Sequence, residues 1–180
     1  KVEGDYVYLD KYVQDCVFIL RKLLYLSSEG NEGQASLNQK FIAGLDRNEI
    51  DDAKIQALKK AFVASRVLAI YGAAGTGKTT LMNHLSNLIG DRSKLFLSKT
   101  HAATENLKRS ITAPGNSSDS MTVDQFIRSS GVDDFDVIFV DECSTIDNRT
   151  MIQLLQKIPL DSLLVLAGDI YQIESIDFGN

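Results

Sequence analysis

A glycine-rich stretch carries the clearest chemistry in the sequence. Residues 72–79 read GAAGTGKT, with an apolar run before them and an amphipathic stretch after them. Glycines let backbone N–H groups converge on phosphate oxygens, and the start of the following helix adds partial positive charge. Lys78 would bring a full charge to the β- and γ-phosphates, and the Thr79 hydroxyl is a ligand for Mg²⁺. The pattern predicts a nucleotide site, with these candidate contacts: Gly72, Ala73, Ala74, Gly75, Thr76, Gly77, Lys78, Thr79 and Thr80.

Two adjacent acids follow another apolar run, in VIFVDECS at residues 137–144. Polar groups at the carboxyl end of a buried strand lie where open α/β sheets bind ligands. Asp141 would hold Mg²⁺, directly or through water, and Glu142 would act as general base toward an attacking water. A nucleotide kinase needs no dedicated water-activating glutamate, because its acceptor is not water. The acid pair therefore favours hydrolysis over a kinase reaction.

A third polar group ends the run LLVLAGDIYQIES, at residues 163–175. Gly168 and Asp169 close the apolar part, and Gln172 follows three residues after the aspartate. An amide can both donate and accept, so Gln172 could touch the γ-phosphate or its water. Taken alone, such a glutamine is also consistent with a solvated loop residue.

Short apolar runs alternate with helical stretches from residue 66 onward, and these elements must position the site. The runs are nearly continuous, which is typical of parallel strands covered on both faces. Strands are expected at residues 67–71, 94–98, 136–140 and 163–167, with helices at 78–89 and 150–158. Strand–helix alternation predicts an α/β domain in layers around a parallel sheet.

The first third of the chain has a different pattern. Val13, Val17, Leu20 and Leu24 recur at helical spacing, which predicts an amphipathic helix. A polar stretch, SSEGNEGQAS, then indicates a loop, and helical patterns follow at residues 37–45 and 51–62. We therefore expect a small helical region over residues 1–62, before an α/β domain over residues 63–180.

The composition sets wider bounds on the class of protein. The 180 residues are 44% hydrophobic and 24% charged, which excludes a disordered or collagen-like chain. No apolar run is long enough for a membrane span, and the start lacks a secretory pattern. Two cysteines far apart in sequence suggest neither a disulfide framework nor a zinc site, so a reducing, cytoplasmic setting is expected. The net charge of −5 argues mildly against a strongly basic nucleic-acid module.

The order of the motifs resembles that of a known family. GAAGTGKT, LSKTHAATENLKR (97–109), MTVDQF (121–126), VDECS and GDIYQIESIDFGN (168–180) are similar to motifs I, Ia, Ib, II and III of superfamily 1 helicases. The RecD/UvrD-like ATP-dependent DNA helicases are the nearest in character, over residues 56–180. The resemblance implies the first RecA-like motor domain of a P-loop NTPase, with ATP and Mg²⁺ as cofactors. It also implies single-stranded DNA, or RNA, as a partner.

The resemblance also assigns roles outside the phosphate loop and the acid pair. Gln172 would sense the γ-phosphate and couple hydrolysis to strand movement, and Gln56 would read the adenine edge. The sequence around Gln56 fits loosely, because Lys54 competes for the aligned position. If Gln56 does not contact the adenine, the expected specificity for adenine is in doubt, whereas the expected phosphate binding is unaffected.

Thr100 and Thr122 match the positions where these helicases touch the backbone of single-stranded DNA. Such contacts hold phosphates and carry little sequence information. His101 is included as a candidate contact, although a polar turn residue is the plainer interpretation. With Lys99, Lys108 and Arg109 it forms a local basic edge, for which a solvated helix face is the alternative.

The sequence ends soon after motif III, so the second RecA-like domain and its arginine finger would have to come from elsewhere in a parent chain. In such enzymes ATP lies between the two domains, and we expect this chain alone to bind nucleotide weakly and hydrolyse it slowly. A regulatory switch ATPase acting on a protein partner is the main alternative. The neighbourhoods of Thr100 and Thr122 separate the two, because only a helicase needs them to bind DNA.

Overall fold

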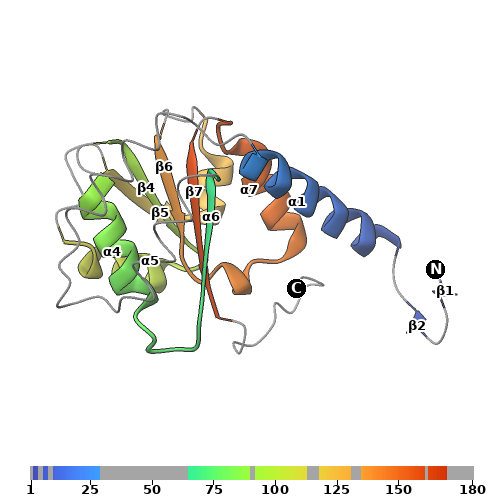
Figure 1. The fold of residues 1–180 in the computed structure, drawn as a ribbon, viewed down its shortest axis with the longest axis horizontal. Coiled ribbons are helices and arrows are strands. Elements are labelled where there is room, and N and C mark those ends of the chain that lie inside the picture. Colours follow the sequence, from blue (N-terminus) through green and yellow to red (C-terminus); the bar gives the residue numbers. More distant parts are fainter. Residues whose placement is uncertain are drawn as a thin grey trace.

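Five parallel strands organise the part of the chain that the computed structural model describes, which is residues 2–3, 6–7, 10–28, 65–89, 92–112, 118–130, 135–160 and 162–169. The sheet has the order β3-β7-β6-β4-β5, and every neighbouring pair is parallel (Figure 1). Its strands are β3 (Val67–Tyr71), β4 (Lys94–Ser98), β5 (Ser118–Thr122), β6 (Val137–Val140) and β7 (Leu163–Gly168). The parallel α/β sheet predicted from the sequence is confirmed.

Helices cover both faces of this sheet (Figure 1). One face packs against α4 (Lys78–Ile89) and α5 (His101–Ser110). The other packs against α1 (Asp10–Ser28), α6 (Val123–Arg128), the 3-10 turn η1 (Cys143–Thr145) and α7 (Asn148–Lys157). Along β7, Val165 and Ala167 enter the first cluster, whereas Leu164 and Leu166 enter the second. The central strands are therefore apolar on both sides, and the domain has three layers.

The strand and helix bounds follow the sequence pattern closely, with local exceptions. β3 and α4 coincide with the expected ranges, while β7 extends one residue further, to Gly168. The helix expected at residues 150–158 begins earlier, at Asn148, because Asp147 caps it by accepting a hydrogen bond from the Thr150 N–H at 2.9 Å. β5 was not expected, since SDSMT is mostly polar; among the described strands it pairs with β4 alone and forms an edge of the sheet.

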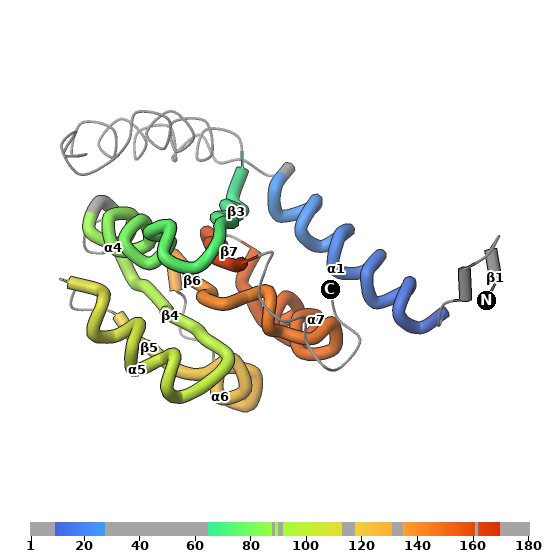
Figure 2. Tube along the Cα trace, turned by 90° about the horizontal axis from the view of Figure 1, so that it is seen from below, coloured from blue at the N-terminus to red at the C-terminus, as the bar shows by residue number. Residues whose placement is uncertain are grey.

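The amphipathic helix expected near the start is present as α1, but its exposed face was not foreseen. Val13, Val17, Leu20 and Leu24 are 37% to 66% exposed. A second apolar stripe of the same helix packs inward instead, with Leu26 buried at 1% exposure and Ile19 and Leu23 against the same cluster. Figure 2 shows α1 running beside α7 and β3. Two apolar stripes occur in one helix, and sequence spacing alone does not say which one faces the sheet.

Two short strands precede α1. β1 (Val2–Glu3) and β2 (Tyr6–Val7) pair antiparallel, with Val2 opposite Val7. The helices expected at residues 37–45 and 51–62, and the boundary expected after residue 62, lie outside the described residues.

Candidate nucleotide-binding site

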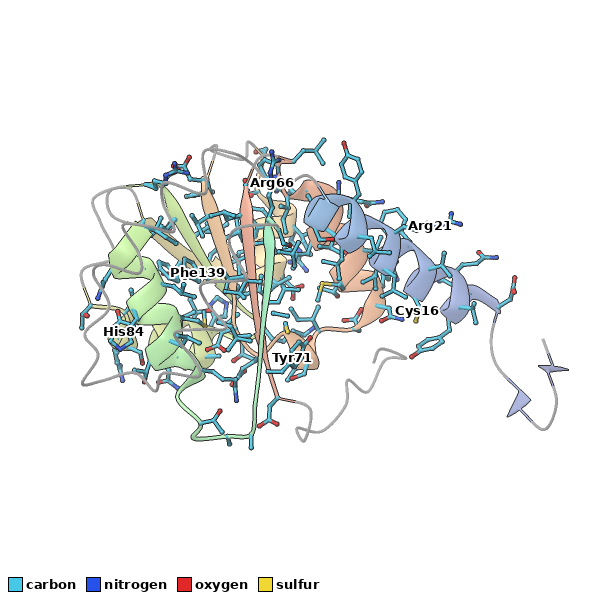
Figure 3. The ribbon with its side chains drawn as sticks, in the orientation of Figure 1. Cys16, Arg21, Arg66, Tyr71, His84 and Phe139 are labelled. Carbon is cyan, nitrogen blue, oxygen red and sulfur yellow. The ribbon has the colours of Figure 1, made fainter. Side chains whose placement is uncertain are left out.

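The strand order brings the phosphate loop and the acid pair to one edge of the sheet. β7 lies between β3, which leads into the loop, and β6, which leads into the acids. Tyr71 pairs with Gly168, and the Gly72 N–H donates to the Gly168 carbonyl at 3.3 Å. Figure 3 shows Tyr71 at this carboxyl edge and Arg66 at the opposite end of β3. Three segments far apart in sequence therefore meet where parallel sheets bind ligands.

The loop over residues 72–79 wraps tightly on itself. Gly75 and Gly77 have φ values of 78° and 84°, a region that favours glycine. A Cβ on Gly72 would lie 2.7 Å from the Thr76 Oγ1, so the first glycine permits a close approach as well. The Thr76 N–H and hydroxyl both donate to the Ala73 carbonyl, at 3.3 and 2.9 Å. The backbone thus favours glycine at positions 75 and 77, whereas Gly72 leaves room for the Thr76 side chain.

The side chain of Lys78, the first residue of α4, folds over the phosphate loop. Its Nζ donates to the carbonyls of Gly72 and Ala73, at 2.6 and 2.9 Å. The same Nζ lies 4.0 Å from Oδ2 of Asp169, at the end of β7. The ammonium therefore lies between two carbonyls of the phosphate loop and the carboxylate that follows β7.

Asp141 and Glu142 stand directly after β6, as predicted. Burial raises the pKa of Asp141, and the hydrogen bond from the Glu142 N–H together with the nearby Lys78 charge opposes that rise. The pKa of Glu142 is raised by burial first and by the negative charge of Asp141 second. Glu142 has φ 53°, and among the described residues no other non-glycine residue has a positive φ. A left-handed backbone is costly for glutamate, and such outliers concentrate at functional sites.

Next to the acid pair, Cys143 contacts Tyr71, and the sequence did not predict this contact. The Cys143 side chain is buried, and its Sγ lies 3.8 Å from the Tyr71 hydroxyl. Burial, and then the charge of and hydrogen bond to Cys143, raise the pKa of Tyr71 to about 12. The Ser144 hydroxyl accepts a hydrogen bond from the Asp169 N–H at 3.2 Å. Asp169 carried a usable signal, since it is a polar residue directly after a buried strand, whereas the Tyr71–Cys143 contact depends on strand order.

The two threonines expected to touch DNA both cap helices at the same edge. Thr100 is exposed, and its hydroxyl accepts from the Ala103 N–H at 3.2 Å, at the start of α5. Thr122 is 4% exposed, and it forms a capping box with Gln125 at the start of α6. Ser98 of β4 and Thr122 of β5 are paired in register, so the two caps follow neighbouring strands.

The local basic edge around Thr100 is partly neutralised. Lys99 pairs with Asp147 at 3.2 Å, and Lys108 pairs with Glu105 at 3.3 Å. Although burial opposes it, hydrogen bonds from Thr150 and Lys99 lower the pKa of Asp147. His101 is exposed in the first turn of α5.

A family comparison agrees with this geometry. Residues 50–180, well over half of the chain, match the model of a family described as an AAA domain. This chain belongs to the AAA domain family. AAA domains are P-loop NTPases, and both the loop at residues 72–79 and the layered parallel sheet fit that class.

The AAA domain is also similar to proteins that are much longer. It is 26% identical over 186 residues to the uncharacterized protein MJ1519 of Methanocaldococcus jannaschii, a match that covers 89% of this chain and 15% of that protein. The arterivirus helicase nonstructural protein 10, solved in complex with DNA, matches at TM-score 0.44 and 17% identity, over 62% of this chain and 30% of that chain. The nsp10 helicase of PRRSV matches at TM-score 0.41 and 17% identity, over 63% and 27%. The AAA domain thus spans less than a third of each of these proteins.

The donor atoms of the AAA domain fit a magnesium ion held together with phosphates. Thr79 is half-buried in the first turn of α4, and Asp141 offers a half-buried carboxylate across β7 from it. These are hard oxygen donors, and Mg²⁺ usually takes one or two protein ligands and completes its shell with phosphates and water. Within the described ranges no cluster of three His, Cys, Asp or Glu side chains could hold a metal alone.

Two predicted contacts of the AAA domain lie outside the described residues, namely Gln56 and Gln172. Among the helices that the structure describes, none has the length and apolar character needed to cross a membrane.

Proposed function

We propose that this AAA domain binds and hydrolyses ATP as the first RecA-like motor domain of a DNA helicase. The observation that carries the proposal is that Lys78 and the Asp141–Glu142 pair lie at one carboxyl edge of the sheet, after β3 and β6, which are separated only by β7. A phosphate-binding lysine and a water-activating acid are the two parts that hydrolysis of a nucleotide requires. The ordered resemblance to helicase motifs supports the choice of ATP and of a nucleic-acid track.

Lys78 and the loop would bind the phosphates. Backbone N–H groups of residues 75–79 lie at the start of α4, where the partial charge of the helix favours anions. Thr79 and Asp141 would hold Mg²⁺, which when bound neutralises charge on the phosphates. Asp141 is suited to this because the Lys78 charge favours its ionised form, which counters the effect of burial.

Glu142 would accept the proton of the attacking water. Its raised pKa makes the carboxylate a stronger base than an exposed glutamate. The left-handed backbone at Glu142 sets the direction in which its side chain leaves the main chain. An arginine from a second RecA-like domain would complete the site by stabilising charge on the γ-phosphate. Such a domain would also let the pair open and close on a strand.

The exposed start of α5 supports a contact with a nucleic-acid backbone. Thr100 and His101 are exposed there, directly after β4, which is the neighbour of β6 in the sheet. Backbone N–H groups in the first turn of a helix bind phosphates without reading sequence. The hydroxyl of Thr122 is buried in its own capping box, so we expect Thr100 to contribute more to binding than Thr122.

The test is ATP binding and hydrolysis with and without oligo-dT. Lys78→Ala should remove ATP binding measurable by calorimetry, whereas Lys108→Ala, the same change on an exposed helix face, should leave it intact. In a longer protein containing this domain, single-stranded DNA should raise the ATPase rate. An unchanged affinity in Lys78→Ala would remove the nucleotide assignment, and a rate indifferent to DNA would remove the helicase assignment.

A switch ATPase acting on a protein partner is the second candidate, and one observation favours it. Lys99 and Lys108 are each paired with an acid, and the Thr122 hydroxyl caps its own helix, so two of the lysine and arginine charges near Thr100 are already neutralised within the domain. ATP binding without any affinity for oligo-dT, at low and at physiological salt, would select this candidate.

A further inference from the structure

Asp169 occupies a position between the two halves of the site, and the proposed mechanism gives it no role. It follows β7, the strand that separates the phosphate loop from the acid pair. Its N–H donates to the Ser144 hydroxyl at 3.2 Å, two residues after Glu142. Its carboxylate Oδ2 lies 4.0 Å from the Lys78 Nζ. One residue therefore touches the segment behind the acids and the lysine of the loop.

The burial of this ion pair gives it more weight than a surface pair. The side chain of Asp169 is 4% exposed and that of Lys78 is 15% exposed. A carboxylate removed from water needs a compensating charge or hydrogen bonds nearby, and an ammonium in such surroundings is screened little by salt. Lys78 has three N–H donors, and two of them are given to the carbonyls of Gly72 and Ala73. The carboxylate of Asp169 thus adds an electrostatic attraction to the two hydrogen bonds that hold the ammonium against the loop.

We propose that Asp169 is a positioning residue for Lys78, which holds the ammonium on the phosphate loop and competes with a nucleotide phosphate for it. This inference rests on the proposed function, because it requires phosphate to bind at Lys78. A phosphate that binds Lys78 must draw the ammonium from its present acceptors, and it also brings negative charge toward Asp169. The carboxylate therefore weakens phosphate binding and favours release of the bound nucleotide.

The direction of this effect makes it testable. Replacing a residue that only supports the fold should weaken ligand binding, whereas Asp169→Asn should tighten it. We expect the Kd for ADP, measured by calorimetry without Mg²⁺, to fall about tenfold, as for one charge contact in partly buried surroundings. Leaving out Mg²⁺ keeps metal binding by Asp141 out of the comparison. Asp136→Asn is the matched control, since it removes the same charge at the opposite edge of the sheet, beside Ser93.

A second readout does not depend on nucleotide. Modification of Lys78 by acetic anhydride, followed by mass spectrometry, should be several-fold faster in Asp169→Asn, because the carboxylate no longer holds the ammonium against the loop. Asp169→Ala should show the same two changes and serves if the asparagine variant does not fold. A folded variant that binds ADP no more tightly than wild type, with Lys78 modified at the wild-type rate, would overturn the inference. That result leaves the proposed function standing as long as Lys78→Ala abolishes ADP binding.

Discussion

Gly168 faces Cys143 so closely that no side chain fits between them: a Cβ on Gly168 would lie 2.9 Å from the Cys143 Sγ. The same Cβ would lie 3.0 Å from Cε1 of Tyr71 and 3.4 Å from the backbone nitrogen of Ser144. Gly168 ends β7, between the strand that leads to the phosphate loop and the strand that leads to the acid pair. The spacing between the two halves of the site is therefore set by the absence of a side chain here.

Gly168→Ala should lower the free energy of unfolding by about 1–3 kcal/mol, because an added methyl in a packed site forces its neighbours to move. Urea denaturation gives the measurement. Removing the sulfur should relieve part of the strain, so Gly168→Ala combined with Cys143→Ala should cost less than the sum of the two single changes. If the losses in free energy of unfolding were fully additive, the alanine side chain at position 168 would not contact Cys143.

Glu142→Gln should slow ATP hydrolysis about 10²–10⁴-fold while ATP binding stays within a few-fold of wild type. The amide keeps the size of the side chain but cannot take a proton from water. Single-turnover hydrolysis and calorimetry measure the two quantities separately. Asp136→Asn, at the opposite edge of the sheet, is the control and should change neither. Hydrolysis at the wild-type rate in Glu142→Gln would exclude the glutamate as base.

The stability of the same variant should depend on pH in a defined direction. The pKa of Glu142 in the folded chain is raised above 4.5, so the folded state holds this proton more tightly than the unfolded chain does. Wild type therefore loses stability from this group as pH rises from about 4.5 through the raised, folded value, and Glu142→Gln does not. The Tm of the variant should exceed that of wild type at about pH 7, and the difference should shrink toward zero near pH 4.

Asp147→Asn should change the pH dependence of stability in the opposite direction, because the pKa of Asp147 is lowered rather than raised. The pKa of Asp147 is lowered below 3.8, because the hydrogen bonds from Thr150 and Lys99 outweigh the effect of burial. Its contribution to stability is present above that value and is lost as pH falls through the lower, folded value. Asp147→Asn should thus be less stable than wild type at about pH 7, by an amount that declines in acid. Equal pH profiles for the two variants would contradict both assignments.

Thr100→Ala should cost about 1 kcal/mol of stability, since the N-terminal cap of α5 is lost, and should also weaken binding of oligo-dT. Thr100→Ser keeps the hydroxyl and should be close to wild type in both respects. Thermal unfolding and fluorescence anisotropy of labelled oligo-dT measure them. If Thr100→Ala lost stability but kept its affinity for oligo-dT, Thr100 would serve only as the helix cap. That result would favour the switch ATPase.

The parts of the site that the sequence predicts are those whose signal is local. The phosphate loop is recognisable because its glycines and Lys78 must stand within eight consecutive residues, from Gly72 to Thr79. β6 and β7 are recognisable because strands buried on both faces are continuous apolar runs. The left-handed backbone at Glu142 has no such signal, since glutamate does not favour that conformation.

The contacts that were missed depend on which strands are neighbours. Asp169 reaches Lys78, and Tyr71 reaches Cys143, only because β7 lies between β3 and β6. Spacing along the chain does not determine that order, because residues 72–142 separate Tyr71 from Cys143 and residues 79–168 separate Lys78 from Asp169. β5 escaped prediction for a related reason, because an edge strand with one partner can be polar.

The face by which α1 packs gives a direct test of the fold, because two leucines in the same helix have opposite surroundings. Leu26 is 1% exposed within the cluster that contains Leu154, whereas Leu24 is 66% exposed. Leu26→Ala should cost about 2–5 kcal/mol, from lost burial and the cavity left behind. Leu24→Ala should stay within about 0.5 kcal/mol, since surface changes seldom do more. The helix propensity of the substitution is the same at both sites, so urea denaturation compares burial alone. Equal losses would mean that the stripe of Val13, Val17, Leu20 and Leu24 is also covered in solution, and that α1 packs by both of its apolar faces.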